Sequence, residues 1–281
     1  MQKQAVIWLN DDLLPLSQAR VSVEDRGFLY GDGFFETLRA EDGRVLFLDE
    51  HLERLKTSAQ AFRFSLPAGY PWKERLREIL AANGLLEGIA AVKILLTRGE
   101  AGGLGLPTPT SPTLVIYARS YLPPSSEEYV SGWPVAIFPE TRTTFLGRHK
   151  SLNYLFYLAA RQYALDQGAR EALILETDGS VSEGAATSLV VCMNEGLITP
   201  AAASALPGVT VSVLARALKR RGKNLEQTRL EPSQVEKAAG LWLANSLIGL
   251  LPIASLNGKP VAQAPETFQM LQECLIQEAS R

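Results

Sequence analysis

One lysine and one glutamate are the residues of this chain best suited to carry chemistry. Lys150 lies in the segment Arg148–Leu155, where apolar and aromatic residues follow it. A lysine near desolvating surface has its charged form disfavoured, and the neutral amine can then act as a nucleophile and a base. Glu183 lies in Ser180–Leu189, before a Gly-Ala-Ala-Thr-Ser run. Local pattern alone favours a surface lysine and a turn glutamate, but it permits imine chemistry at Lys150.

Three other segments could bind an anion or line a reaction site. Residues 31–37 read Gly-Asp-Gly-Phe-Phe-Glu-Thr, residues 51–55 read His-Leu-Glu-Arg-Leu, and residues 206–210 read Leu-Pro-Gly-Val-Thr. The last of these begins a predicted helix, whose unpaired N–H groups and positive dipole end favour phosphate. An arginine can meet a phosphate with a bidentate fork, although most arginines on such helices are surface charges.

Taken together, these segments resemble the class IV (fold type IV) pyridoxal-phosphate enzymes, which include branched-chain and D-amino-acid aminotransferases and 4-amino-4-deoxychorismate lyase. The resemblance runs from Asp25 to Pro252. It implies an α+β, two-domain fold of the D-amino-acid aminotransferase-like type, with pyridoxal 5'-phosphate in the interdomain cleft and a homodimer that completes the site. It also implies that Lys150 forms the imine with the cofactor, and that Glu183 keeps the pyridine nitrogen protonated so that the ring acts as an electron sink.

The resemblance assigns the cofactor phosphate to groups from three parts of the chain. These groups are the Arg54 guanidinium, the backbone amides of Val209 and Thr210 with the Thr210 hydroxyl, and the hydroxyl of Ser246, which follows Asn245. Without the resemblance, Asn245 and Ser246 would be expected to cap the end of a buried strand, because buried amides and hydroxyls need partners.

Two features favour the lyases over the aminotransferases of this family. Side chains alternate along a strand, so Thr37 shares one face with Phe35. The lyases carry a threonine at this place and branched-chain aminotransferases a glycine, and a hydroxyl over the ring could relay a proton. The second feature is the Asn-Ser pair before Leu247, which looks more like the lyases.

One feature departs from the family pattern. Many members carry an arginine in a Gly-Gly-Arg-Gly-Tyr-like stretch that grips a substrate carboxylate, whereas this chain has Leu104. A leucine cannot hold an anion. Arg98, Arg39, Arg142 or an arginine of a partner subunit are the candidates to replace it.

The expected function is therefore a PLP-dependent 4-amino-4-deoxychorismate lyase that forms 4-aminobenzoate and pyruvate in folate biosynthesis. The alternative is a class IV aminotransferase that acts on branched-chain or D-amino acids and uses Lys150 and Glu183 in the same way. A third reading, a noncatalytic binding protein on this scaffold, is kept because fold does not fix function. Intact Lys150, Glu183 and Arg54 argue against it.

Composition agrees with a small-molecule substrate. The chain has 281 residues, 46% of them hydrophobic, which is enough for two lobes, and a net charge of −2, which gives nucleic acid or anionic lipid no basic surface to bind. The N-terminal apolar run meets charge at Asp11, too early for a signal peptide or a membrane span, so a cytoplasmic protein is expected. Two cysteines and two histidines make a disulfide framework or a metal site improbable.

The periodicity of apolar residues predicts an N-terminal α/β lobe over 1–119, a linker over 120–128 that contains consecutive prolines, and a C-terminal lobe over 129–281 that carries Lys150. Strands are predicted at 5–9, 34–40, 45–48, 91–97, 113–118, 171–176, 189–192, 241–244 and 253–256. Helices are predicted from 49 to 62, around 72–80, over 152–166 and 209–221, and around 268–275.

Overall fold

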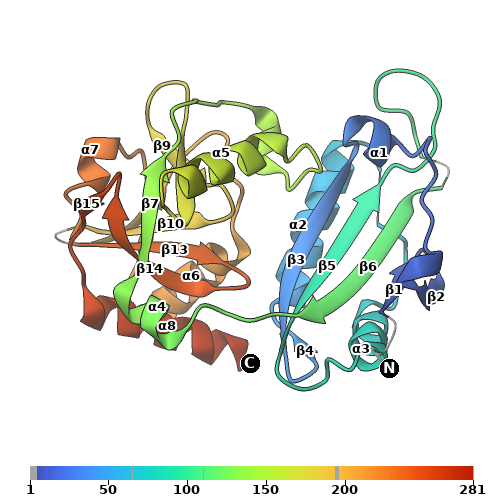
Figure 1. Cartoon of the computed structure of the whole chain (residues 1–281), viewed down its shortest axis with the longest axis horizontal. Coiled ribbons are helices and arrows are strands. Elements are labelled where there is room, and N and C mark those ends of the chain that lie inside the picture. The colour runs from blue at the N-terminus through green and yellow to red at the C-terminus, as the bar shows by residue number, and fades with distance from the viewer. Residues whose placement is uncertain (1–4, 65, 110, 194–195, 281) are drawn as a thin grey trace. The chain divides into compact units, whose positions relative to one another are not determined.

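The computed structural model describes residues 5–64, 66–109, 111–193 and 196–280 (Figure 1). The chain divides into two compact units, each of which is described by itself. Unit 1 comprises Met1–Pro123 and His149–Asn153, and unit 2 comprises Pro124–Arg148 and Tyr154–Arg281. The segment around Lys150 therefore groups with unit 1, whereas the sequence placed it in the C-terminal lobe.

Unit 1 is built on one antiparallel sheet. Its elements are β1 (Val6–Leu9), β2 (Asp12–Pro15), α1 (Arg26–Tyr30), β3 (Gly33–Glu41), β4 (Arg44–Val45), α2 (Leu48–Ala61), α3 (Trp72–Ala82), β5 (Ile89–Thr97) and β6 (Thr113–Ser120). The strand order is β2-β1-β6-β5-β3-β4. Helix α2 packs on β3, and α3 packs on β1 and β6, so both helices cover one side of the sheet (Figure 1).

Alternation along the strands of unit 1 gives the sheet a core face and an open face. Even-numbered residues of β5 are buried and odd-numbered ones are half-buried, as expected for a strand with one face on a core. Leu38, Val92, Ile94 and Ile116 lie on the core face and are almost fully buried. The odd-numbered residues of β3, β5 and β6 lie on the other face, which we call the open face.

Unit 2 contains a nine-stranded mixed sheet in the order β12-β11-β10-β13-β14-β7-β8-β9, with β15 paired to β14. Its strands are β7 (Trp133–Ile137), β8 (Glu171–Leu175), β9 (Val181–Gly184), β10 (Ser188–Met193), β11 (Gly196–Pro200), β12 (Leu225–Thr228), β13 (Gly240–Asn245), β14 (Gly249–Leu256) and β15 (Lys259–Pro260). Strand β9 at one end of this order also contacts β10 and β11, so the sheet curls back on itself.

Five α-helices accompany this sheet among the described residues. They are α4 (Ser126–Ser131), α5 (Leu155–Asp166), α6 (Val209–Arg220), α7 (Pro232–Val235) and α8 (Pro265–Ala279). Helix α5 packs on β7 and β8, whereas α6 packs on β13 and α8 packs on α6 and β14 (Figure 1). The buried aliphatic side chains of the central strands, such as Leu189, Leu243 and Leu251, form the core under them.

Several predicted elements differ from the observed ones; the strand predicted at 253–256, for example, begins at Gly249. The strand predicted at 45–48 ends at Val45, because Phe47 has the left-handed φ of 53° and α2 begins at Leu48. The helix predicted from residue 152 begins at Leu155, because the Leu152 N–H donates to the Gly33 carbonyl in unit 1. Helix α4 begins inside the predicted linker, with a capping box at Ser125.

In the part of the chain that the structure describes, no helix is both long enough and apolar enough to cross a membrane.

Candidate functional site

Lys150 lies beside the first residues of β3, against the ring of Phe35. The Phe35 N–H donates to the Lys150 carbonyl at 2.8 Å, which fixes the lysine backbone against the strand. The Lys150 Nζ lies 4.7 Å from the centroid of the Phe35 ring, within the range of a cation–π contact. Phe35 belongs to the open face of the sheet, so the amine of Lys150 lies on the face that also carries Thr37.

A second lysine shares this aromatic ring. Lys93 is the cross-strand partner of Thr37 on β5, and its Nζ lies 4.5 Å from the centroid of the Phe35 ring. Burial lowers the pKa of Lys93, and the positive charge of Arg119 lowers it further. Sequence reasoning missed Lys93, although a lysine inside the apolar run 90–96 was an available signal.

Behind this strand, a buried carboxylate organises helix α2. Glu36 is 1% exposed and points to the core side of β3. Its Oε1 accepts from the Arg54 Nε at 2.8 Å, and its Oε2 accepts from the Arg54 Nη2 at 2.6 Å and pairs with the His51 Nδ1 at 2.7 Å. A carboxylate can only accept, so His51 presents a protonated Nδ1 to it.

The pKa values of both titratable members of this group are lowered, for different reasons. Burial disfavours ionised Glu36, but the Arg54 charge and the hydrogen bonds from Arg54 and His51 prevail and lower its pKa to about 2. Burial lowers the pKa of His51, although Glu36 opposes the shift. Arg54, predicted to bind phosphate, is thus held in one orientation by a bidentate pair with Glu36, and its side chain is 11% exposed.

In unit 2, the carboxylate of Glu183 is buried and held from two sides. Its Oε1 accepts from the Tyr157 hydroxyl at 2.8 Å, and its Oε2 accepts from the Leu206 N–H at 3.0 Å. Glu183 lies on β9, Tyr157 on α5, and Leu206 in the loop before α6. The position of this acid therefore depends on three separate segments. Sequence reasoning did not find Tyr157, because nothing local marks one tyrosine of a helix as a donor to a distant strand.

Two tyrosines lie close to this acid, and an arginine lies over the ring of one of them. The rings of Tyr154 and Tyr157 stack with centroids 4.9 Å apart. Burial and the charge of Glu183 raise the pKa of both phenols, so both stay protonated. The Arg142 guanidinium lies 4.9 Å from the ring centroids of Tyr157 and Phe156, and its buried Nη1 has no hydrogen-bond partner among the described residues.

A cavity of about 410 Å³ opens beside Glu183 within unit 2. Its lining includes Ser182, Glu183, Ser188, Gly208 and Ser212, together with Arg148 and residues of the loop 200–207. Helix α6 begins at this wall, and its N-cap, Gly208, provides no side chain to bind the first N–H groups. The cavity thus combines a buried acid with a helix N-terminus that favours an anion.

The remaining predicted cofactor-binding residues occupy two places in unit 2. Val209 and Thr210 form the first turn of α6 and are 5% and 4% exposed. Asn245 and Ser246 lie where β13 turns into β14, and the Asn245 Oδ1 accepts from the N–H groups of Leu247 and Ile248 at 2.9 Å each. The Asn245 side chain therefore holds this turn, as expected for a residue that caps a strand end.

Two of the predicted substitutes for the missing carboxylate-binding arginine, Arg98 and Arg39, have defined hydrogen-bond partners. Arg98 is fully buried and donates to both oxygens of Asp32 and to the carbonyls of Pro107 and Phe62. It therefore holds the loop that contains Leu104, whose side chain is 93% exposed. The Arg39 Nε donates to Glu41 at 2.7 Å.

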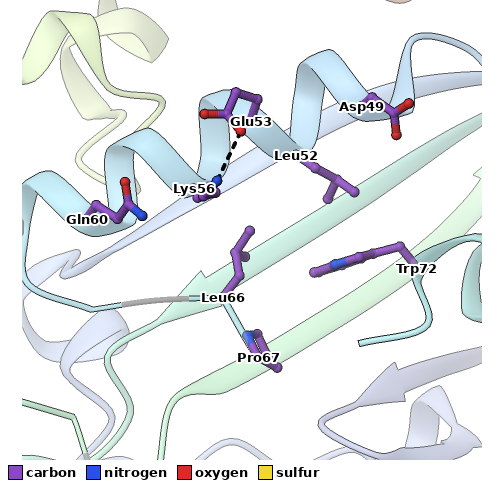
Figure 2. A pocket seen from close by; sticks show the side chains of 8 residues that line it. All are labelled: Asp49, Leu52, Glu53, Lys56, Gln60, Leu66, Pro67 and Trp72. Carbon is purple, nitrogen blue, oxygen red and sulfur yellow. Dashed lines mark hydrogen bonds and ion pairs between the residues drawn. The ribbon is translucent and has the colours of Figure 1, made fainter. Parts of the chain in front are cut away.

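Figure 2 shows a second hollow, in unit 1, between α2 and the segment 66–72. Leu66 and Trp72 face polar residues of α2, where Lys56 pairs with Glu53 at 3.4 Å. Among the described residues, its lining includes neither Lys150 nor Arg54. This hollow is separate from the candidate site.

Among those same residues, no three His, Cys, Asp or Glu side chains come together as a metal site would require.

Comparison with known proteins identifies a family. The model of the family described as amino-transferase class IV matches residues 33–256. The D-alanine aminotransferase of Bacillus licheniformis is 26% identical over 98% of this chain and 99% of its own. Branched-chain-amino-acid aminotransferase-like protein 1 of Arabidopsis thaliana is 29% identical over 90% of this chain, which spans only 46% of that relative.

Two solved structures share the fold. One, from Legionella pneumophila, is described as "Putative 4-amino-4-deoxychorismate lyase"; it is 25% identical, has a TM-score of 0.86 and matches 94% of this chain and 97% of its own. The other is the PLP-bound form of a hypothetical aminotransferase from Mycobacterium tuberculosis. It is 22% identical and has a TM-score of 0.83, over 98% of this chain and 99% of its own. These likenesses confirm the predicted two-domain fold.

Replacing Glu36 with Gln is expected to lower the free energy of unfolding at neutral pH by about 3 kcal/mol, because Arg54 would stay buried without its carboxylate. In the wild type, the pKa of Glu36 falls from 4.5 to about 2 on folding. Its ionised form therefore stabilises the fold above pH 4.5, and this contribution is lost as the pH falls toward 2. The variant should lack that part of the acid sensitivity in urea unfolding followed by circular dichroism.

The matched control is Glu53→Gln on α2, the helix that carries Arg54; the Glu53 carboxylate is exposed. This change should cost at most about 0.5 kcal/mol. An equal loss in both variants, or unchanged acid sensitivity in Glu36→Gln, would contradict the role given to Glu36.

Proposed function

Because the chain belongs to the class IV aminotransferase family, for which pyridoxal 5'-phosphate is the cofactor, we propose that it is a 4-amino-4-deoxychorismate lyase. The reaction forms 4-aminobenzoate and pyruvate, a step of folate biosynthesis. The observation that carries this proposal is the group on the open face of unit 1. There, Lys150 and Lys93 share the ring of Phe35, and the Thr37 hydroxyl lies opposite Lys93 on the neighbouring strand.

The residues present fit the cofactor. Glu183 has its two oxygens held by Tyr157 and Leu206, which suits a carboxylate that must face a ring nitrogen. The first turn of α6 suits a phosphate, and a Cβ at Gly208 would come within 2.4 Å of the Ser188 hydroxyl, so the backbone at this turn must stay bare. Arg54, Val209, Thr210 and Ser246 are the proposed phosphate ligands, and Lys150 the proposed covalent attachment point.

When bound, the cofactor supplies an electron sink for the carbon that carries the substrate amine. Glu183 keeps the ring nitrogen protonated, and Tyr157 and Leu206 keep Glu183 in place. The Lys150 Nζ accepts the proton from the amine-bearing carbon, and the Thr37 hydroxyl delivers a proton to the leaving enol, which becomes pyruvate. Departure of pyruvate leaves an aromatic ring, which favours completion of the reaction.

Lys93 is the proposed replacement for the missing arginine as the group that binds a substrate carboxylate. The substrate of the lyase carries two carboxylates, and an anion beside a half-buried ammonium forms a charge-assisted hydrogen bond. Arg98 is committed to Asp32 and to backbone carbonyls, so it cannot take this role without losing the loop that it holds. We therefore assign one substrate carboxylate to Lys93.

The second candidate is an aminotransferase for branched-chain or D-amino acids. The relatives named as aminotransferases favour it, and their names are the specific observation in its support. Lys150 and Glu183 would act as in the lyase, with the amino group passed to a keto acid instead of being kept on an aromatic product. Thr37 has no required part in that reaction.

A homodimer is part of the proposal. Helix α1 and the segment before it expose Val23, Phe28, Leu29 and Tyr30, each more than half accessible to solvent. Large apolar side chains gathered in one segment mark an interaction surface. A second copy of the chain is the proposed partner.

The test of the function is turnover of enzymatically generated aminodeoxychorismate by protein loaded with pyridoxal phosphate. Release of 4-aminobenzoate is expected, and Lys150→Ala should reduce it to background, whereas the exposed Lys56→Ala should leave it unchanged. Borohydride reduction should label only the peptide that contains Lys150. No 4-aminobenzoate, with conversion of the cofactor to its pyridoxamine form by amino acids, would favour the aminotransferase.

Thr37→Ala is expected to reduce turnover by about a hundredfold, because the proposed proton donor is lost. The absorption of the bound cofactor should stay the same, since Thr37 is not among its proposed ligands. Thr37→Ser restores a hydroxyl and should recover most of the rate. Equal rates for the alanine variant and the wild type would remove Thr37 from the mechanism.

Lys93→Met is expected to raise KM for the dicarboxylate substrate by about tenfold to a hundredfold, the usual effect of losing a hydrogen bond to a charged group. Lys93→Arg, which keeps the charge, should have a smaller effect. A KM that does not change in the methionine variant would show that another residue binds the carboxylate.

A further inference from the structure

Glu176 is a buried acid with four hydrogen bonds and no part in the mechanism above. It directly follows β8 and is 4% exposed. Its Oε1 accepts from the Ser182 hydroxyl at 2.8 Å and from the Ser204 N–H at 3.0 Å. Its Oε2 accepts from the Thr143 hydroxyl at 2.6 Å and from the Ser204 hydroxyl at 3.0 Å.

The segments that Glu176 joins are the ones that hold Glu183. Ser182 precedes Glu183 on β9, and Ser204 lies two residues before Leu206, whose N–H donates to Glu183. The two bonds from Ser204 hold the loop 201–208 to Glu176 at the end of β8, and Glu176 in turn holds Ser182 of β9. One buried carboxylate therefore fixes both the strand that carries Glu183 and the loop whose Leu206 N–H donates to Glu183.

We propose that Glu176 is a positioning residue that sets the Glu183 carboxylate against the ring nitrogen of the cofactor, acting through Ser182 and Ser204. This inference rests on the proposed function, since it assumes that Glu183 faces that nitrogen. In this role Glu176 acts only through its hydrogen bonds to Ser182 and Ser204.

The chemistry of the four donors explains why an acid is needed at this position. Three hydroxyls and one backbone N–H donate to Glu176, and a carboxylate has acceptor sites for all four. The Ser204 hydroxyl also accepts from the Thr144 N–H at 2.7 Å, so its proton is directed to Glu176. An amide at position 176 would present an N–H group to at least one of these donors, and the loop would have to move. Burial disfavours the charge, but the hydrogen bonds prevail and lower the pKa of Glu176.

The experiment compares Glu176→Gln with Asp178→Asn. Asp178 lies in the same turn between β8 and β9 and bonds Ser180 and Arg229 instead of the groups that hold Glu183. In the loaded enzyme, Glu176→Gln should shift the pH titration of the cofactor absorption band and reduce kcat by about tenfold to a hundredfold, with little change in KM. Asp178→Asn should change neither.

A second readout requires no cofactor. In the apoprotein, amide hydrogen exchange at Leu206 should become faster in Glu176→Gln and stay unchanged in Asp178→Asn, because only the first change releases the loop. If Glu176→Gln does not fold, Ser204→Ala, which removes a single donor hydroxyl, should show the same shifts in smaller measure.

The results of these experiments distinguish a failure of the proposed lyase function from a failure of the positioning role of Glu176. A wild-type protein that takes up no pyridoxal phosphate would overturn the proposed function and this inference with it. A wild type that binds the cofactor, beside a Glu176→Gln variant that loses thermal stability but keeps the wild-type titration, kcat and Leu206 exchange, would overturn this inference alone. Equal shifts in Glu176→Gln and Asp178→Asn would also overturn it, since the effect would then belong to the turn.

Discussion

A buried carboxylate needs hydrogen-bond donors in place of water. This requirement explains how several elements of the structure are joined. Glu183 takes its donors from α5 and from the loop before α6, so the acid is in place only when helix, loop and strand are assembled. Glu36 does the same in unit 1, where it holds Arg54 and His51 of α2 against the sheet. In both units a buried acid connects elements that are distant in sequence, because unsatisfied burial would cost several kcal/mol.

Because side chains alternate along a strand, one face of β3 in unit 1 packs on the core and the other carries the candidate reactive side chains. Phe34 and Glu36 face the core and its helices, while Phe35 and Thr37 face the open side with Lys93. A register slip of one residue would exchange these sets and place the threonine and the lysine in an apolar core. The buried aliphatic row of β5 makes such a slip very costly. Packing on one face thus fixes which side chains are available on the other.

The sequence predicts the parts of the candidate site that have a local signature, and it does not show those created by tertiary contact. Motifs mark Lys150 and Glu183, and a proline and a glycine mark the helix that begins at Val209. Tyr157 could not be found in this way, because its role depends on how α5 packs beside β9. Because Lys150 follows the predicted linker in the sequence, its position predicts that it belongs to the C-terminal lobe. The hydrogen bond from Phe35 to the Lys150 carbonyl, which groups that segment with unit 1, has no counterpart in the local sequence.

Two further buried acids of unit 2 also accept hydrogen bonds from other segments, and their donors lie just before and just after Glu183 in the sequence. Glu176 binds the Ser182 hydroxyl just before it, and Glu171 binds the Ala186 N–H and the Thr187 hydroxyl just after it. Burial raises the pKa of Glu171, although the Arg161 charge opposes the shift. Three carboxylates so close in sequence would repel one another if they shared one cavity. Each instead has its own set of donors, so the acids on either side hold the backbone around Glu183 through bonds that do not involve its carboxylate.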